Sequence, residues 1–249
     1  MIFTIDAGNT RTKLSIFESN TIIEQHVFEN NDLEKKIKTF FSNYHEKPHV
    51  VMSSVVNFEQ DLSQWLQENT TLTVISHTTP LPFVNKYSTP NSLGIDRIVL
   101  AAGATLMFPN QNKLIIDAGT CITYDFVTNQ EEYLGGGISP GLTLRYKSLN
   151  DHTAKLPLLQ LNDFSELIGN STEQSIHSGV INGTVQEIEG IINEYKLLYP
   201  NLTIILTGGD TVFLAKRLKN IIFANSTFLP ESLNLLYQYT IENGQKNFS

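Results

Sequence analysis

Short apolar runs separated by polar turns dominate the chain, and stretches with helical spacing lie between them. Residues 3–5 and 14–17 are rich in β-branched and aromatic side chains, with Gly8 and Asn9 between them, which is typical of a tight hairpin. Apolar runs predict further strands over 21–28, 50–56, 72–75, 114–116 and 202–206. Apolar residues at helical spacing predict helices over 32–43, 58–68, 98–108, 171–198, 210–218 and 230–241.

One part of this pattern occurs twice. The first run ends in Asp6-Ala7-Gly8 and the run at 114–116 ends in Asp117-Ala118-Gly119, with Ile-Asp-Ala-Gly identical in both. Each copy presents a carboxylate, turn amides and hydroxyls together, and the first copy adds Lys13. Carboxylates bind hard cations such as Mg²⁺, and turn amides bind phosphate oxygens. The duplication predicts two related domains, 1–112 and 113–249.

Charge and composition exclude several classes of protein. A formal net charge of −8 and the lack of any basic run argue against a nucleic-acid partner. No apolar stretch approaches the roughly 20 residues of a membrane span, and Met1 leads directly into the first strand, so we expect a cytoplasmic protein with no membrane partner. The lone Cys121 excludes a disulfide within the chain, and its apolar surroundings predict a buried side chain.

A proline-broken loop over 78–94 leads into Gly94-Ile95-Asp96-Arg97 and the helix that follows. Asn91 or Ser92 is the expected helix cap, which places Asp96 and Arg97 near the helix N-terminus. Taken alone, Asp96 is a first-turn aspartate favoured by the helix dipole. Its place between the two phosphate-binding hairpins favours a functional role.

Four motifs in order carry a resemblance. They are Asp-x-Gly-Asn-Thr-x-x-Lys at 6–13, Gly-x-Asp-Arg at 94–97, Asp-x-Gly-Thr at 117–120 and Gly-Gly-x-Ile-x-Pro-Gly at 135–141. Together they resemble the type III pantothenate kinases of the acetate and sugar kinase/Hsc70/actin superfamily. The resemblance implies an α/β fold of two duplicated ribonuclease H-like (actin-like ATPase) domains with a cleft between them. It also implies ATP-dependent phosphorylation of pantothenate, the first step of coenzyme A biosynthesis.

The resemblance implies roles for individual residues. The ATP-binding set is Asp6, Ala7, Gly8, Asn9, Thr10, Arg11, Thr12, Lys13 and Thr120, with Asp6 near Mg²⁺ or another divalent cation. Asp96 would be catalytic and accept the hydroxyl proton, and Arg97 would pair with the pantothenate carboxylate. The remaining substrate-binding residues would be Tyr87, Gly94, Ile95 and Thr172. Asp117 would bind a monovalent cation, K⁺ or NH₄⁺, and the protein would be a homodimer.

Two other functions agree with part of the sequence. A superfamily kinase for another small hydroxylated acid or a sugar would keep Asp6, Lys13 and Asp117 but would not need Arg97. A nucleotide-binding regulatory protein would not need the carboxylate of Asp96, which therefore favours catalysis. The 135–141 segment is expected near the nucleotide or at a subunit interface, or else as a plain turn. Arg145 and Lys147 are expected to be solvated.

Overall fold

The computed structural model describes residues 1–8, 11–44, 46–54 and 60–246. The chain forms two compact units. Unit 1 comprises residues 1–107 together with the segment from Thr227 onward, and unit 2 comprises Phe108–Ser226. The ranges expected from the sequence break the chain close to the same point but assign the last helix to the second half. Its packing assigns that helix to unit 1.

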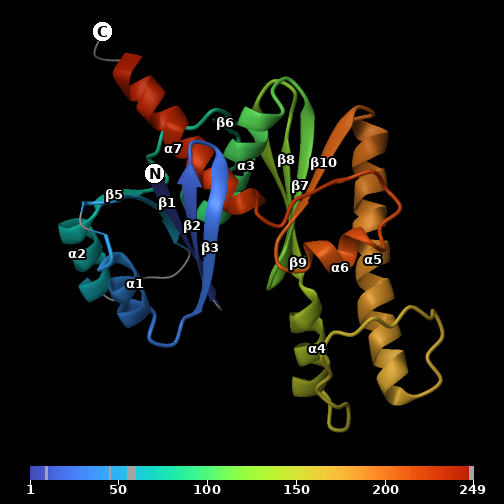
Figure 1. Cartoon of the computed structure of the whole chain (residues 1–249). Coiled ribbons are helices and arrows are strands. Elements are labelled where there is room, and N and C mark those ends of the chain that lie inside the picture. The colour runs from blue at the N-terminus through green and yellow to red at the C-terminus, as the bar shows by residue number, and fades with distance from the viewer. Residues whose placement is uncertain (9–10, 45, 55–59, 247–249) are drawn as a thin grey trace. The chain divides into compact units, whose positions relative to one another are not determined.

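Unit 1 is built on a five-stranded mixed sheet with the order β3-β2-β1-β4-β5 (Figure 1). Its strands are β1 (Ile2–Ala7), β2 (Arg11–Glu18), β3 (Thr21–Glu29), β4 (His49–Ser54) and β5 (Thr71–Val74), and a short strand β6 (Val84–Asn85) follows. Its helices are α1 (Leu33–Phe41), α2 (Gln60–Asn69), the 3-10 helix Pro90–Ser92, α3 (Ile95–Met107) and α7 (Phe228–Lys246).

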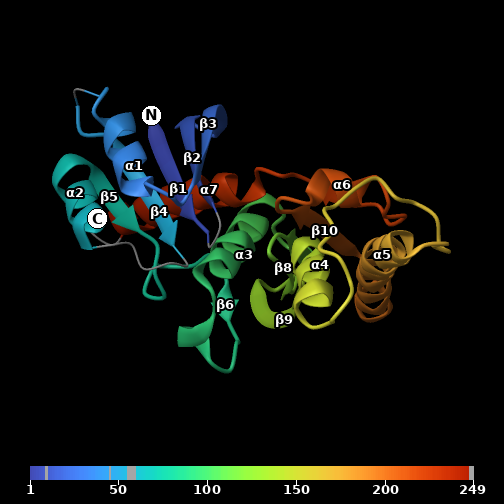
Figure 2. The ribbon, with the colours of Figure 1, turned by 90° about the horizontal axis from the view of Figure 1, so that it is seen from below.

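Helices cover this sheet in two pairs, which can be followed in Figure 2. α1 and α2 bury Phe41 and Leu66 against Phe3 and Ile5 of β1, and the partly buried Trp65 packs against this core. α3 and α7 pack against each other and against β1 and β4. Their contact is close at Gly103, because a Cβ atom there would lie 1.9 Å from the Ser232 Oγ atom.

Unit 2 repeats this architecture with the strand order β11-β10-β7-β8-β9. Its strands are β7 (Asn112–Ala118), β8 (Cys121–Val127), β9 (Glu132–Pro140), β10 (Leu202–Thr207) and β11 (Phe223–Ala224). Its helices are α4 (Leu142–Asp151), the long α5 (Thr172–Leu198) and α6 (Thr211–Ala215). Apolar side chains of all three helices, such as Tyr146, Ile188 and Leu214, form one buried cluster with Ile116 and Leu206 of the sheet.

The two sheets have the same topology. In each, the first strand pairs antiparallel with the second and parallel with a later strand, as β1 does with β2 and β4 and β7 does with β8 and β10. Both second strands also shift register near their ends, at Ile16/Phe17 and at Phe126/Val127. The duplicated α/β fold expected from the repeated Ile-Asp-Ala-Gly signal is therefore confirmed.

Some element boundaries differ from those expected. Asn91 and Ser92 lie in the 3-10 helix and do not cap α3, which begins at Ile95 directly after Gly94. α6 ends at Ala215 instead of Leu218, and residues 55–56 of the expected fourth strand lie outside the described residues. Across the described ranges, none of the helices is both long enough and apolar enough to span a bilayer.

Candidate active site

The first of the two turns predicted to bind phosphate, called the first phosphate-binding turn below, joins β1 to β2. Strand pairing places Asp6 opposite Lys13 and Ala7 opposite Thr12, and the Gly8 N–H donates to the Arg11 carbonyl over 3.1 Å. A carboxylate on β1, before the turn, and an ammonium on β2, after it, therefore lie on neighbouring strands. Thr12 is fully buried and its hydroxyl donates to a side-chain oxygen of Asn30. The expected ATP contacts of Asn9 and Thr10 lie outside the described residues.

Asp6 is the most strongly perturbed carboxyl of this turn. Burial raises its pKa to about 6, the charge of Lys13 opposes that rise, and the charge of Asp96 adds to it. Asp6, Lys13 and Asp96 are thus close enough to interact, although Asp96 lies 90 residues further along the chain. Two neighbouring carboxylates repel each other and attract cations.

The Gly94–Arg97 segment is shaped by Asp96. The Asp96 carboxylate turns back to accept a hydrogen bond of 2.8 Å from the Arg97 backbone N–H, in the first turn of α3. A Cβ atom at Gly94 would lie 2.4 Å from the Asp96 Oδ1 atom, so only glycine leaves room for this conformation. Just before it, the His77 Nε2–H group donates to the Leu93 carbonyl over 2.8 Å. Hydrogen bonds therefore fix the Gly94–Arg97 segment both at the preceding Leu93 and at Arg97.

Arg97 and Tyr87 come together in the structure. The Arg97 side chain is only 6% exposed, and its guanidinium lies 5.9 Å from the centre of the Tyr87 ring, within the range of a cation–π contact. A buried, always charged fork of N–H donors next to an aromatic ring suits a small ligand that carries a carboxylate. Two of the predicted substrate-binding residues are thus neighbours of each other, and Asp96 directly precedes Arg97 in the sequence.

The second turn predicted to bind phosphate, at Asp117–Cys121 of unit 2 and called the second phosphate-binding turn below, is bonded to two glycine-containing segments. The Gly141 N–H donates to the Thr120 carbonyl over 3.0 Å, and the Asp210 N–H donates to the Ala118 carbonyl over 3.0 Å. Gly208 has a φ of +96°, and a Cβ atom there would lie 2.4 Å from both the Ala118 carbonyl oxygen and the Asp117 Oδ1 atom. A carboxylate oxygen of Asp117 and the carbonyl oxygen of Ala118 therefore gather at this glycine.

The expectation of a buried Cys121 is wrong, because the side chain is exposed. Cys121 is the first residue of β8, directly after the turn. The buried side chains of this strand start with Ile122 and continue with Tyr124, and neighbouring residues of a strand point to opposite faces. The period-2 pattern of the strand therefore directs Cys121 away from the core.

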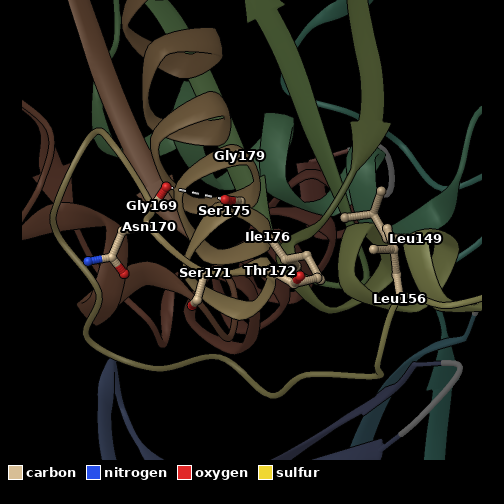
Figure 3. A pocket seen from close by; sticks show the side chains of 9 residues that line it. All are labelled: Leu149, Leu156, Gly169, Asn170, Ser171, Thr172, Ser175, Ile176 and Gly179. Atoms are coloured by element: carbon tan, nitrogen blue, oxygen red, sulfur yellow. Dashed lines mark hydrogen bonds between the residues drawn. The ribbon is translucent and has the colours of Figure 1, made fainter.

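Thr172 lies in an open pocket of about 800 Å³ in unit 2, shown in Figure 3. α5 begins at Thr172, and the Ser171 hydroxyl caps the helix by accepting a bond from the Gln174 N–H. Both apolar and polar residues line the pocket: Leu149, Leu156, Gly169, Asn170, Ser171, Thr172, Ser175, Ile176 and Gly179. Gly179 faces open space, so a side chain there would enter this pocket. Thr172 belongs to unit 2, whereas Tyr87 and Arg97 belong to unit 1.

Arg145 is a residue whose role the sequence did not reveal. It is not simply solvated: its side chain donates to the Pro140 carbonyl and the Ser139 hydroxyl, each over 2.8 Å, and pairs with Glu187 of α5 over 2.5 Å. Tyr124 also donates to Glu187, over 3.0 Å. Burial alone would raise the pKa of Glu187, but the bonds from Arg145, Ser139 and Tyr124 and the charge of Arg145 hold it below the ordinary value. Lys147 is exposed, as expected.

The distance in sequence between Arg145 and Gly141 could have indicated the contact of Arg145 with the end of β9. Arg145 lies four residues after Gly141, so the first turn of α4 brings its side chain back over the end of β9. The network of Arg145 and Glu187 thereby holds Ser139–Gly141, and Gly141 in turn bonds to Thr120. The 135–141 segment is mostly strand β9, and its end braces the second phosphate-binding turn.

The candidate cation ligands are single carboxylates. Within the described residues, no three or more His, Cys, Asp or Glu side chains are grouped to hold a metal ion. Burial raises the pKa of the Asp6 carboxyl, so a negative charge is unfavourable there. A bound divalent cation would neutralise that charge. At Asp117, carboxylate and carbonyl oxygens together form the hard oxygen donors that alkali cations prefer. Both positions therefore fit the cations expected there.

Comparisons with known proteins show the family of this chain. A family model described as "Type III pantothenate kinase" matches residues 2–194. The type III pantothenate kinase of Flavobacterium johnsoniae is 54% identical over 98% of this chain and 100% of its own length. That of Phocaeicola vulgatus is 37% identical over 94% of this chain and 97% of its own length.

Solved structures support the fold. A Campylobacter jejuni protein described as a candidate Baf family transcriptional activator has a TM-score of 0.60 at 19% identity, over 96% of this chain and 99% of its own. A candidate N-acetylmannosamine kinase from Listeria monocytogenes has a TM-score of 0.55 at 14% identity, over 97% of this chain and 99% of its own. At such identities these likenesses concern the fold alone.

Proposed function

The chain belongs to the type III pantothenate kinase family, and we propose that it transfers the γ-phosphoryl group of ATP to the hydroxyl of pantothenate. The product is 4'-phosphopantothenate, and the reaction is the first step of coenzyme A biosynthesis. The observation that carries the proposal is the grouping of Asp6, Lys13 and Asp96 within unit 1, with the buried Arg97 directly after Asp96. Phosphate-binding and acceptor-binding groups thus adjoin each other.

Each of these residues has a part in the reaction. Phosphoryl transfer depends mainly on positioning and on charge stabilisation, which Lys13 and the turn amides supply. Arg97 pairs with the carboxylate of pantothenate and so directs the other end of the substrate toward Asp96. Asp96 orients the substrate hydroxyl and takes its proton late in the transfer. Tyr87, Gly94, Ile95 and Thr172 complete the substrate-binding set.

Two cations belong to the proposal. A divalent cation, Mg²⁺ or another, held with the help of Asp6, neutralises phosphate charge when it is bound. Asp117 would hold a monovalent cation, K⁺ or NH₄⁺, next to Thr120, which contacts ATP. The oxygens that gather at Gly208 support the second assignment.

The proposal extends to partners and location. A metabolic kinase with a net charge of −8 fits the cytoplasm and has no need of nucleic acid or membrane. A homodimer is proposed from the family resemblance, and sedimentation of the purified chain tests it.

The direct test is mass-spectrometric detection of phosphopantothenate after incubation with ATP, Mg²⁺ and pantothenate, in K⁺ or in Na⁺. A product peak that depends on K⁺ supports both the reaction and the monovalent-cation site. A chain that binds ATP but yields no peak would refute pantothenate as the substrate. A panel of sugars and hydroxy acids would then identify the acceptor, and Arg97 favours an acid over a sugar.

A further inference from the structure

A side chain outside every motif spans the first phosphate-binding turn. Asn30 lies directly after β3, whose last residue, Glu29, is paired with Arg11 at the end of the turn. The Asn30 side chain accepts a bond of 3.0 Å from the Thr12 hydroxyl and donates a bond of 3.0 Å to the Gly8 carbonyl. One amide group therefore ties Gly8, which directly follows β1, to Thr12 near the start of β2.

The two bonds allow only one orientation of the amide. Thr12 donates its hydroxyl hydrogen and Gly8 offers only a carbonyl oxygen, so the amide oxygen must face Thr12 and the amide nitrogen must face Gly8. The Gly8 N–H is used as well, because it donates to Arg11. Both backbone polar groups of Gly8 are thus committed within the protein, which fixes the direction of the chain at the entrance to the turn.

Asn30 is itself anchored. Its backbone carbonyl accepts a bond from the Leu33 N–H at the start of α1, and its side chain is half-buried. Thr12, its partner, is fully buried and lies between Arg11 and Lys13 on β2. Asn30 is therefore fixed by the connection between β3 and α1 and can hold Gly8 and Thr12 in place.

We propose that Asn30 is a positioning residue for the nucleotide. By holding Gly8 and Thr12 it keeps the end of β1 and the start of β2, with Lys13 next to Thr12, in position to receive the phosphates of ATP before ATP arrives. Donors that are oriented in advance stabilise charge without paying for reorganisation during the reaction. The inference rests on the proposed function for the identity of the acceptor but needs only nucleotide binding for its test.

The test compares Asn30→Ala and Asn30→Asp with Asn31→Ala, a matched control at the neighbouring exposed asparagine. Steady-state kinetics give kcat and the KM values for ATP and pantothenate. Calorimetric titration with a non-hydrolysable ATP analogue and Mg²⁺ gives nucleotide affinity without any acceptor. Urea unfolding followed by the fluorescence of Trp65, which packs in the same unit, gives the stability.

We expect Asn30→Ala to raise both the KM for ATP and the Kd of the analogue by about 10-fold, since small misplacements of binding groups cost this much or more. The KM for pantothenate should stay the same. Asn30→Asp should bind the analogue more weakly still, because a carboxylate oxygen would face the Gly8 carbonyl and add negative charge near the phosphates. Asn31→Ala should behave like the parent chain.

Unchanged analogue affinity in Asn30→Ala would overturn the proposal. So would an equal rise in both KM values together with a loss of stability, because that pattern belongs to a purely structural residue. If the parent chain binds the analogue but does not phosphorylate pantothenate, the proposed reaction fails while the calorimetric comparison still decides the role of Asn30.

Discussion

The raised pKa of Asp6 predicts that the active site destabilises the free protein. Burial favours the neutral carboxyl in the folded chain, so its pKa is about 6 instead of the ordinary 3.8. As the pH rises from 4 to 6, the unfolded chain ionises Asp6 while the folded chain still holds the proton. The unfolded state then binds fewer protons than the folded state, and stability falls across this range. Above pH 6 the folded chain bears the full free-energy cost of ionising the buried Asp6 carboxyl.

The size of this effect follows from the two pKa values. A pKa difference of about 2 corresponds to about 3 kcal/mol at 1.36 kcal/mol per unit. Asp6→Asn replaces the carboxyl with a neutral group of the same shape and removes the cost of ionisation. The variant should therefore be more stable than the parent chain by about 3 kcal/mol at pH 7, and by little near pH 4. Its ability to bind Mg²⁺ and ATP should be lost.

Urea unfolding between pH 4 and pH 7.5 measures this difference, with EDTA present and nucleotide absent. Trp65 is the single tryptophan of the chain and packs against the core that contains β1, so its fluorescence reports the unit that holds Asp6. Asp61→Asn, at an exposed position of α2, controls for the removal of one negative charge from the same unit. A gain that is equal at all pH values, or a loss of stability at pH 7, would refute the reasoning.

Three further substitutions test the site. Asp96→Asn should keep ATP affinity and lower turnover by about 10²- to 10⁴-fold, the usual effect of losing an acid–base group, and unimpaired turnover would exclude Asp96 from proton transfer. Arg97→Ala should raise the KM for pantothenate by about 10- to 100-fold, as expected for a lost charged hydrogen bond, and a parallel loss of ATP affinity would mean that Arg97 is structural. Arg145→Ala should lower the stability of unit 2 by about 2 kcal/mol, measured by calorimetry, because Glu187 and the Ser139–Pro140 segment lose a charged donor. The exposed Lys147→Ala is its control, and equal stabilities of the two variants would contradict the bracing role.

The repeated hairpin could be predicted from the sequence because its signals are local. An apolar run, a glycine turn and a repeated Asp-Ala-Gly lie within a few neighbouring positions, and two copies of this pattern imply one topology. The first-turn position of Asp96 was predictable for the same reason, although its expected cap was wrong, because the chain enters α3 through Gly94 after a separate 3-10 turn.

The contacts that support the hairpins were not predictable. Asn30 and Thr12 are 18 residues apart, and Arg145 and Glu187 are 42 residues apart, so no local pattern links them. Cys121 was misjudged because the apolar letters around it do not reveal which face of a strand a residue occupies until its register is known. The position of α7 in unit 1 depends on a close contact between Gly103 and Ser232, more than 120 residues apart in the chain.

The placement of α7 in unit 1 also has a consequence for synthesis on the ribosome. Domains usually fold in the order in which they emerge, but unit 1 needs Phe228, Leu233 and Leu236, which are fully buried and are translated after all of unit 2. Unit 2 is complete in sequence at Ser226, so it can fold first while α3 still exposes the apolar surface that α7 will cover. During synthesis there is thus a stage at which unit 2 can already be folded while unit 1, most of which was made earlier, still lacks α7.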